Sequence, residues 1–411
     1  MNSLPTTSTD YAHPYRPALV KAYNIAARPF FSKALATLTS EKLIAHAVRA
    51  ERFDHLGRNE IETPLEVLLN AIRNEANLSP FGLFVTKQRL LNLLRNRLRV
   101  NKLLSDHPEI NDVKITPPIL ITGLQRTGTT LLHRLLTLDP DHRALLSYEA
   151  LNPAPLHANP QVDKKKKQKL AHTAQKALSY IAPDFFAIHP VEAAAPEEDV
   201  LLLDYALIST VAESTLRVPS YARWVERADN RPAYEYLKLL LKVLSWRTPT
   251  RTWILKSPHH LEFLADFAAV FPEATVVMTH RDPTATLPSF CSMMAHGRGI
   301  FSDVVDPVEI GDHWLRKTAR MLKKSQQYRT EHPSARIVDI YYDDFIAHPI
   351  DQIQRIYRAS EKPFIEESAE LVRTGLQQNR QHKYGVHKYD LTSFGLTEEK
   401  IRAAYGELYG K

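Results

Sequence analysis

The chain has 411 residues, of which 44% are hydrophobic and 24% charged, with a formal net charge of +7. This composition is ordinary for a globular protein and supports a large core in one or two domains. The basic excess suits an anionic ligand, but no basic stripe with interleaved aromatic residues and no nucleic-acid motif occurs, so we expect no binding to DNA or RNA.

Cysteine use and hydropathy bear on the compartment. The single cysteine, Cys291, cannot form an intrachain disulfide, which fits a reducing cytoplasm. The first residues lack the basic start and apolar run of a secretory signal, and no segment approaches the ~18 uncharged apolar residues of a membrane helix. The sequence therefore predicts a cytoplasmic protein without a membrane span.

Residues 1–112 are predicted to form a helical region packed on the core. Apolar residues at helical spacing follow Pro64, which we place in the first turn of a helix. After Ser79 and Pro80, a second helix over residues 85–104 combines a leucine stripe with a strongly basic opposite face. We interpret that face as solvated surface, with a membrane or partner contact as the alternative.

Residues 113–411 alternate predicted strands and helices. The strands are ILITGL, WILK, ATVVMTH and RIVDIYYDDF, and two long helices are expected around residues 197–210 and 233–246. The lysine run 164–167 is interpreted as a solvated loop or helix start. The alternation predicts an α/β fold, with a P-loop-like parallel sheet covered by helices on both faces.

The strongest motif is GLQRTGTT, residues 123–130, between a predicted strand and a predicted helix. Its spacing is that of a P-loop with Thr129 in place of the lysine. Gly128 lets the backbone approach an anion, and the free amides of the helix start point at it. Thr127, Thr129 and Thr130 add hydroxyls, and Arg126 adds a fork for two oxygens.

The missing lysine argues against an enzyme that uses nucleoside triphosphates and magnesium. A kinase-like P-loop enzyme nevertheless remains an alternative, as does a non-catalytic nucleotide-binding protein with the same fold.

A second candidate phosphate site follows the strand ATVVMTH. Arg281 ends the strand and Ser289 lies eight residues on, about two turns into the next helix, where its hydroxyl could return toward Arg281.

Together these motifs resemble those of sulfotransferases that use 3′-phosphoadenosine 5′-phosphosulfate (PAPS), in particular bacterial members with a helical N-terminal region. The resemblance extends from about Phe53 to Leu396, and Gln125 departs from it by replacing the usual proline. It implies a 5′-phosphosulfate loop at residues 123–130 and a 3′-phosphate site at Arg281 and Ser289. It also implies that a basic C-terminal loop closes over the nucleotide through one or more of Arg380, Lys383 and Lys388.

Sulfuryl transfer requires a cation near the bridging oxygen and a base near the acceptor hydroxyl. Arg126 and Lys256 are the candidate cations. The candidate bases are Glu149, slightly preferred, and His260, which matches the histidine of the family pattern K-S-P-x-H-L. The acidic run 196–199 is interpreted as a helix start, with an acceptor pocket as the alternative.

No metal-binding pattern occurs, so PAPS is the only co-substrate expected. The acceptor hydroxyl could belong to a small molecule, a sugar or a lipid, and the sequence leaves the oligomeric state open.

Overall fold

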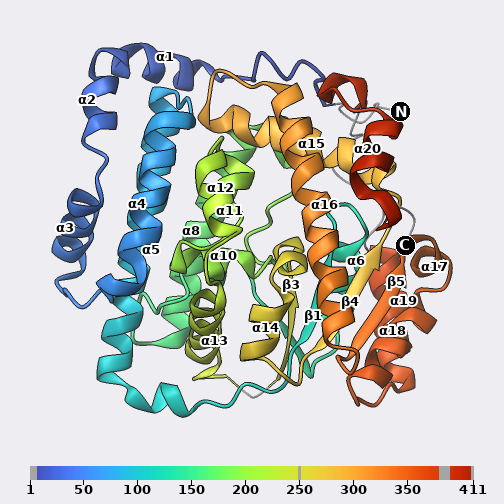
Figure 1. Cartoon of the computed structure of the whole chain (residues 1–411). Helices are drawn as coiled ribbons and strands as arrows, with labels where there is room; N and C mark the ends of the chain where they lie inside the picture. The colour runs from blue at the N-terminus through green and yellow to red at the C-terminus, as the bar shows by residue number, and fades with distance from the viewer. Residues whose placement is uncertain (1–6, 249–250, 379–388, 409–411) are drawn as a thin grey trace.

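A five-stranded parallel sheet forms the centre of the molecule (Figure 1). The structure is a computed structural model that describes residues 7–248, 251–378 and 389–408. The strands are β1 (Ile119–Gly123), β2 (His142–Ala144), β3 (Thr252–Lys256), β4 (Thr275–His280) and β5 (Ile337–Tyr341), in the order β2-β3-β1-β4-β5. The α/β fold predicted from the sequence is confirmed, with β2 as a strand that the sequence analysis missed.

The strand order places a switch point between β1 and β4. After β1 the chain runs to β2 and β3 on one side, and it then crosses to β4 and β5 on the other. In open parallel sheets, ligands bind at the carboxyl ends of the strands on either side of such a point. The loops after β1 and β4 are those that carry the two predicted phosphate motifs.

Side chains alternate across the sheet and separate two cores. Ile119 and Ile121 of β1 belong to one apolar cluster, whereas Leu120 belongs to the other. The first cluster is covered by α6 (Thr129–Leu136), α17 (Tyr342–Ala347), α18 (Pro349–Ala359) and α19 (Glu366–Gln378). The second includes residues of α13 (Arg231–Ser245) and α14 (Leu264–Val270).

The N-terminal helices extend the second core. They are α1 (Ala18–Ala27), α2 (Phe31–Ala36), α3 (Ser40–Glu51), α4 (Arg58–Glu75) and α5 (Pro80–Asp106). Buried leucines of α3 to α5 lie in the same cluster as Leu120 of the sheet. The apolar core therefore runs without interruption from the helical region to the sheet.

Among the described residues, the remaining α-helices comprise six short ones and three long ones. The short ones are α7 (Ser147–Leu151), α9 (Pro183–Ile188), α10 (Val200–Leu203), α11 (Val211–Thr215), α12 (Pro219–Val225) and α20 (Glu398–Tyr405). The longer ones are α8 (Pro160–Ile181), α15 (Pro283–Phe301) and α16 (Pro307–Glu331). No helix in the described ranges has both the length and the apolar character of a membrane span.

Three predicted elements differ from the structure. Pro64 lies inside α4 because the apolar stripe starts upstream, at the fully buried Ile61. The helix expected at residues 197–210 is broken, since Leu207 adopts a left-handed conformation with φ of 54°. The last predicted strand is half as long as expected, and α17 begins at Tyr342.

The basic face of α5 is not solvated surface. Arg89 pairs with Asp204 at 2.6 Å, and Arg95 and Arg99 both pair with Glu51. Other acids of the fold thus neutralise these arginines. Similarly, the lysine run 164–167 lies inside α8, where Lys167 is buried and pairs with Asp163.

Candidate functional site

The loop between β1 and α6 has the conformation of an anion-binding loop. Gly128 has φ of +89°, which only glycine adopts without strain, and an added Cβ would lie 3.1 Å from the Tyr342 ring. Arg126 also has a positive φ, of +70°. For a non-glycine residue this costs on the order of 1–3 kcal/mol, and such strain gathers at functional sites. The loop is thus shaped for a ligand at the cost of local stability.

Hydroxyl groups hold the loop against the neighbouring strand. Thr127 is buried, and its Oγ1 lies 2.6 Å from the carbonyl of Leu124 and 2.6 Å from Oγ1 of Thr279 on β4. Thr129 is buried at the first position of α6, whereas Thr130 is exposed. Thr127 therefore fixes the loop to β4, and the exposed Thr130 is available to a ligand.

Arg281, at the end of β4, lies beside this loop. Its Nη1 donates a 3.0 Å hydrogen bond to the carbonyl of Arg126, and its guanidinium stacks 3.9 Å from the centre of the Tyr342 ring. Ser289 is buried in α15. The two motifs predicted to bind the two ends of one nucleotide are thus physically joined.

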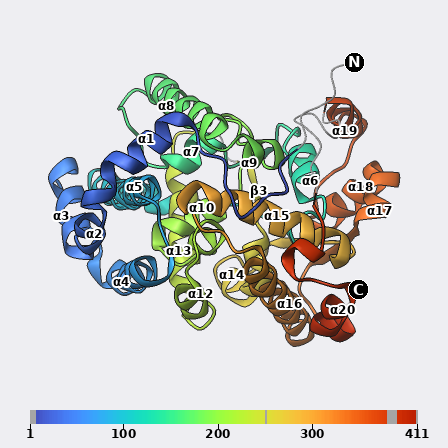
Figure 2. The same cartoon turned by 90° about the horizontal axis from the view of Figure 1, so that it is seen from above.

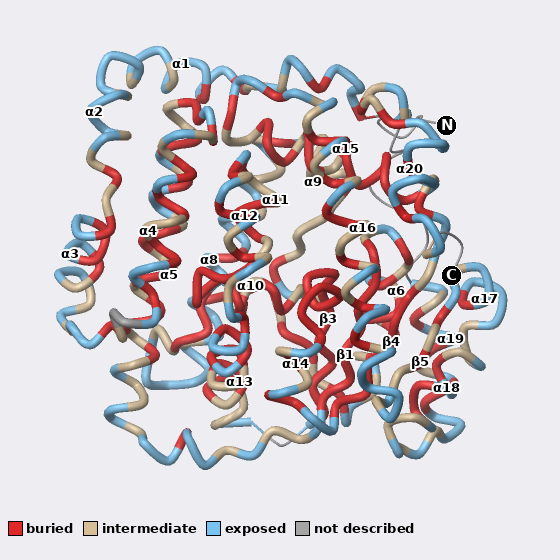
Figure 3. Tube along the Cα trace, viewed as in Figure 1, coloured by how far each residue is buried: buried red, intermediate tan, exposed pale blue. Residues whose placement is uncertain are grey.

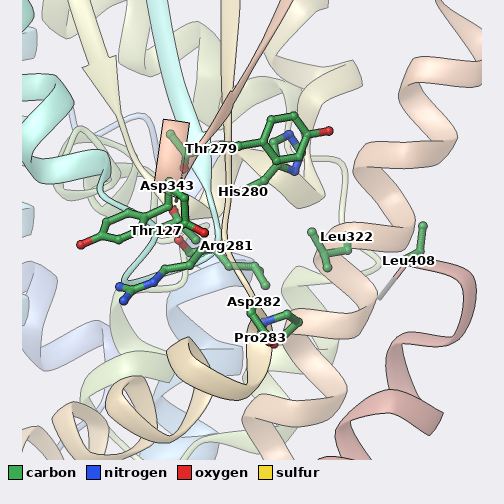
Figure 4. A pocket seen from close by; sticks show the side chains of 12 residues that line it. Thr127, Thr279, His280, Arg281, Asp282, Pro283, Leu322, Asp343 and Leu408 are labelled. Carbon is green, nitrogen blue, oxygen red and sulfur yellow. Dashed lines mark hydrogen bonds between the residues drawn. The ribbon is translucent and has the colours of Figure 1, made fainter. Parts of the chain in front are cut away.

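A cavity of about 240 Å³ opens at this junction (Figure 4). Thr127, Thr279, Arg281 and Asp343 lie on its wall, together with Tyr341 and Tyr342 from the end of β5. The cavity combines aromatic rings, a guanidinium and hydroxyls at the switch point, which are the groups that would hold a phosphorylated nucleotide.

Lys256 ends β3 at the same edge of the sheet. Its side chain is buried, and its Nζ lies 2.7 Å from Oε1 of Glu198. Its amide donates a 2.8 Å hydrogen bond to Oδ1 of Asp199. The acidic run that the sequence analysis interpreted as a helix start therefore supplies the partners of the candidate catalytic lysine.

His260 is completely buried behind Lys256. Its Nε2 lies 2.8 Å from Oδ2 of Asp199, and its Nδ1 lies 2.9 Å from the hydroxyl of Tyr234. Burial by itself raises the pKa of Asp199, but His260 and the Lys256 amide lower it below its usual range. With both ring nitrogens engaged, His260 has the contacts of a positioning residue, and its role as a base remains an untested prediction.

Glu149 also has structural partners on both carboxylate oxygens. One oxygen accepts a 3.0 Å bond from Arg143, and the other accepts from the amide of Leu146 at the start of α7. The carboxylate of Glu149 therefore caps the first turn of a short helix. These contacts give Glu149 a structural task at the start of α7. Its predicted role as the base stays a prediction.

His189 is a functional candidate that the sequence analysis missed. It follows α9, and burial lowers its pKa, with Glu197 and Glu198 opposing that shift and Lys256 and Arg126 adding to it. His189 is thus within electrostatic range of both candidate cations. It lies far from the loop motif in the sequence, and no sequence pattern marks it.

The C-terminal loop is described only in part. Arg380, Lys383 and Lys388 lie outside the described residues, so their predicted nucleotide contacts stay predictions. Tyr389, where the description resumes, is close enough to Arg126 to act on the charge of its guanidinium. The chain therefore returns to the phosphate loop at that point.

The fold and this site define an α/β protein with a strained loop after β1 and a cavity beside it at the carboxyl edge of the sheet. The model of the sulfotransferase family matches residues 117–366, more than half of the chain, and the chain belongs to that family. Sulfuryl transfer is therefore its class of reaction, and the kinase-like alternative is not supported.

Relatives and solved structures agree with this assignment. The omega-hydroxy-beta-dihydromenaquinone-9 sulfotransferase Stf3 of Mycobacterium bovis is 26% identical over 258 residues, and the match covers 59% of this chain. The matched region spans 62% of the Stf3 chain, which is less than two thirds of the length of that relative.

Two crystal structures match over 90% of this chain. Sulfotransferase STF1 from Mycobacterium tuberculosis has a TM-score of 0.79 and 30% identity over 98% of its own chain. Sulfotransferase STF9 from Mycobacterium avium has a TM-score of 0.80 and 25% identity over 95% of its chain. These matches include the helical N-terminal region as well as the sheet.

Proposed function

We propose that this sulfotransferase takes its sulfuryl group from PAPS and transfers it to a hydroxyl of an apolar small molecule or lipid. The observation that carries the donor assignment is the contact between Arg281 and the backbone of Arg126. It joins a loop shaped for a 5′-phosphosulfate to a guanidinium suited to a 3′-phosphate, across a cavity at the switch point. A phosphate at the 3′ position is what distinguishes PAPS from ordinary adenine nucleotides.

In the proposed reaction the acceptor oxygen attacks sulfur while the bond from sulfur to the bridging oxygen breaks. Negative charge develops on the bridging oxygen, and Arg126 and Lys256 stabilise it. The products are a sulfate ester and adenosine 3′,5′-bisphosphate, and the acceptor proton moves to a protein base.

We propose Glu198 as that base, in preference to Glu149 and His260. Its carboxylate is partly exposed and lies 2.7 Å from Nζ of Lys256, so it is next to the group expected to hold the sulfuryl oxygens. When PAPS attracts the lysine, the carboxylate of Glu198 becomes free to accept a proton. His189 lies within electrostatic range of the same groups and is a second polar residue that could orient the acceptor.

The proposed acceptor cavity measures about 250 Å³ and lies between residues 8–15, α9 and α15. Phe185, in α9, lines it, and its ring packs within 3.3 Å of a Cβ built on Gly297 of α15. Helix α9 has six residues, about 9 Å of rise, and leads from this cavity to His189. The cavity lining combines apolar residues such as Ile300 with Asp184 and His296, so we propose an elongated acceptor that has both apolar and polar groups. Such an acceptor is consistent with the omega-hydroxy-beta-dihydromenaquinone-9 after which the Stf3 relative is named.

The direct test is turnover of PAPS with a panel of phenols, sterols, sugars and isoprenoid alcohols. We expect adenosine 3′,5′-bisphosphate to form only with an acceptor present, and fastest with an apolar one. Binding of PAPS without turnover of any acceptor would instead support a non-catalytic nucleotide-binding protein.

A further inference from the structure

The two N-terminal helices expose apolar side chains to solvent. Leu19 is 72% exposed, Ile25 75% and Phe30 69%. Within the described residues only Val304, at 70%, is a large hydrophobic residue of similar exposure. Such residues usually occur singly on a surface, so a group of them within so short a segment requires an explanation.

The exposure follows from the way α1 sits on α5. The buried side of α1 is formed by Val20, and Asn24 accepts a 2.8 Å hydrogen bond from the amide of Phe81 at the start of α5. On the opposite side, Leu19, Ala22 and Ala26 fall on one solvent-facing stripe at helical spacing. The apolar face of α1 is therefore turned outward, which is the reverse of a helix packed on its own core.

Aromatic residues continue this stripe onto the first turn of α5. Tyr23 lies 6.0 Å from Phe81 and 5.9 Å from Phe84, measured between ring centres, and Phe84 is 46% exposed. We call the exposed residues Leu19, Tyr23, Ile25, Phe30 and Phe84 the N-terminal apolar face. Figure 3 shows α1 and α2 as a largely exposed edge of the molecule.

The charged residues within this segment of the sequence are basic, and one of them, Arg16, pairs with Asp303 at 2.9 Å. Between Tyr11 and Ser40 the sequence contains Arg16, Lys21, Arg28 and Lys33, and no aspartate or glutamate. Lys21, Arg28 and Lys33 are exposed. Outward-facing Leu, Ile, Phe and Tyr flanked by lysine and arginine are the features of a helix that lies in the interface of an anionic bilayer.

We propose that the N-terminal apolar face docks the enzyme on the surface of an anionic lipid bilayer. Residues 7–17 connect the N-terminal apolar face to the end of the molecule where the strands end. Arg16 donates to the carbonyl of Ser302 at 2.6 Å, and Tyr11 donates to Ser292 of α15 at 3.0 Å. Figures 1 and 2 show this segment crossing above α15 at the end toward which the strands point. A chain held by this face therefore presents its carboxyl edge to the membrane surface.

The test is flotation of the full chain with vesicles of phosphatidylcholine alone and with phosphatidylglycerol added. We expect binding to the anionic vesicles that weakens as salt is raised, and little binding to the neutral ones. The triple variant L19S/I25S/F30S should bind the anionic vesicles about tenfold or more weakly, because it loses the inserted side chains. The matched control L170S/I346S/I365S removes three exposed apolar residues from α8, α17 and the segment before α19, and it should bind like the wild type.

The triple variant should turn over a water-soluble acceptor at the wild-type rate. A failure of membrane docking is therefore distinguishable from a failure of the proposed sulfotransferase function. Failure of the wild type to float, or equal flotation of the triple variant, would overturn the proposal. Concentration-dependent dimerisation that the triple variant abolishes would also overturn it, by assigning the face to a second copy of the chain.

Discussion

Nζ of Lys256 lies 2.7 Å from Oε1 of Glu198, although the two residues are 58 positions apart in the sequence. The pair places a cation at the end of β3 and a carboxylate at the start of α10 in direct contact. Asp199, the next residue, accepts a hydrogen bond from the backbone amide of the same lysine and also contacts His260. Glu198 thus pairs with the side chain of Lys256 at the candidate site, whereas Asp199 binds the Lys256 backbone and His260 in the core.

The first prediction concerns the base. Glu198→Gln should lower turnover by about 10²- to 10⁴-fold, the usual contribution of a general base, while its amide oxygen can still contact Lys256. Affinity for adenosine 3′,5′-bisphosphate should stay near the wild-type value. The measurements are turnover of PAPS and calorimetric titration of the bisphosphate.

Glu149→Gln and His260→Asn are the matched comparisons for this base. We expect both to lose stability, because each breaks contacts that hold α7 or Asp199. Their turnover per folded molecule should fall less than that of Glu198→Gln. A near-normal Glu198→Gln enzyme beside an inactive, well-folded Glu149→Gln enzyme would return the base to Glu149.

The second prediction concerns the nucleotide. Adenosine 3′,5′-bisphosphate should bind more tightly than AMP, and Arg281→Ala should narrow that difference by about 1.5–3 kcal/mol, the range of a charge-assisted hydrogen bond. The control Arg336→Ala removes an exposed arginine from the opposite end of β5, where it pairs with Glu361. Equal affinity of the wild type for the two nucleotides would contradict the 3′-phosphate site.

The third prediction concerns metals. Turnover should persist in EDTA, because the cation role falls to Arg126 and Lys256. Loss of turnover in EDTA with recovery on addition of magnesium would show that a divalent ion takes part in the reaction.

The fourth prediction concerns the stability of α6. His133 is buried in this helix, where Nε2 lies 3.2 Å from the carbonyl of Ile254. Burial, followed by the charge of Lys256, lowers the pKa of His133 to about 3. The unfolded chain takes up this proton below pH ~6.5 and the folded chain does not, so the free energy of unfolding falls as the pH falls.

As the pH falls from about 7.5 to about 5, His133 alone should lower the free energy of unfolding by about 2 kcal/mol. His133→Met never carries the charge, so its free energy of unfolding should fall by about that much less over the same interval. Urea unfolding of both proteins at the two pH values gives the comparison. An unchanged pH dependence would mean that the folded protein accommodates the protonated ring.

Much of the fold and half of the site could be predicted from local sequence. The residue order strand, GLQRTGTT, helix predicted the candidate anion-binding loop, because a glycine and a helix start expose backbone amides whatever surrounds them. The positions of Arg281 and Lys256 followed as well, since the carboxyl ends of parallel strands share one edge. Here the chemistry is carried by consecutive residues and the regular geometry of a strand.

The tertiary structure decided which acids and histidines face that edge. The sequence around Glu149, His260 and Glu198 does not show which of the three faces that edge. In the tertiary structure Glu149 pairs with Arg143, His260 is buried against Asp199, and Glu198 lies beside Lys256. In the same way, α5 acquired internal partners for its arginines, while α1 was left with its apolar face outward. Such outcomes depend on contacts between distant segments, which determine burial and therefore whether a polar or apolar side chain is available for binding and chemistry.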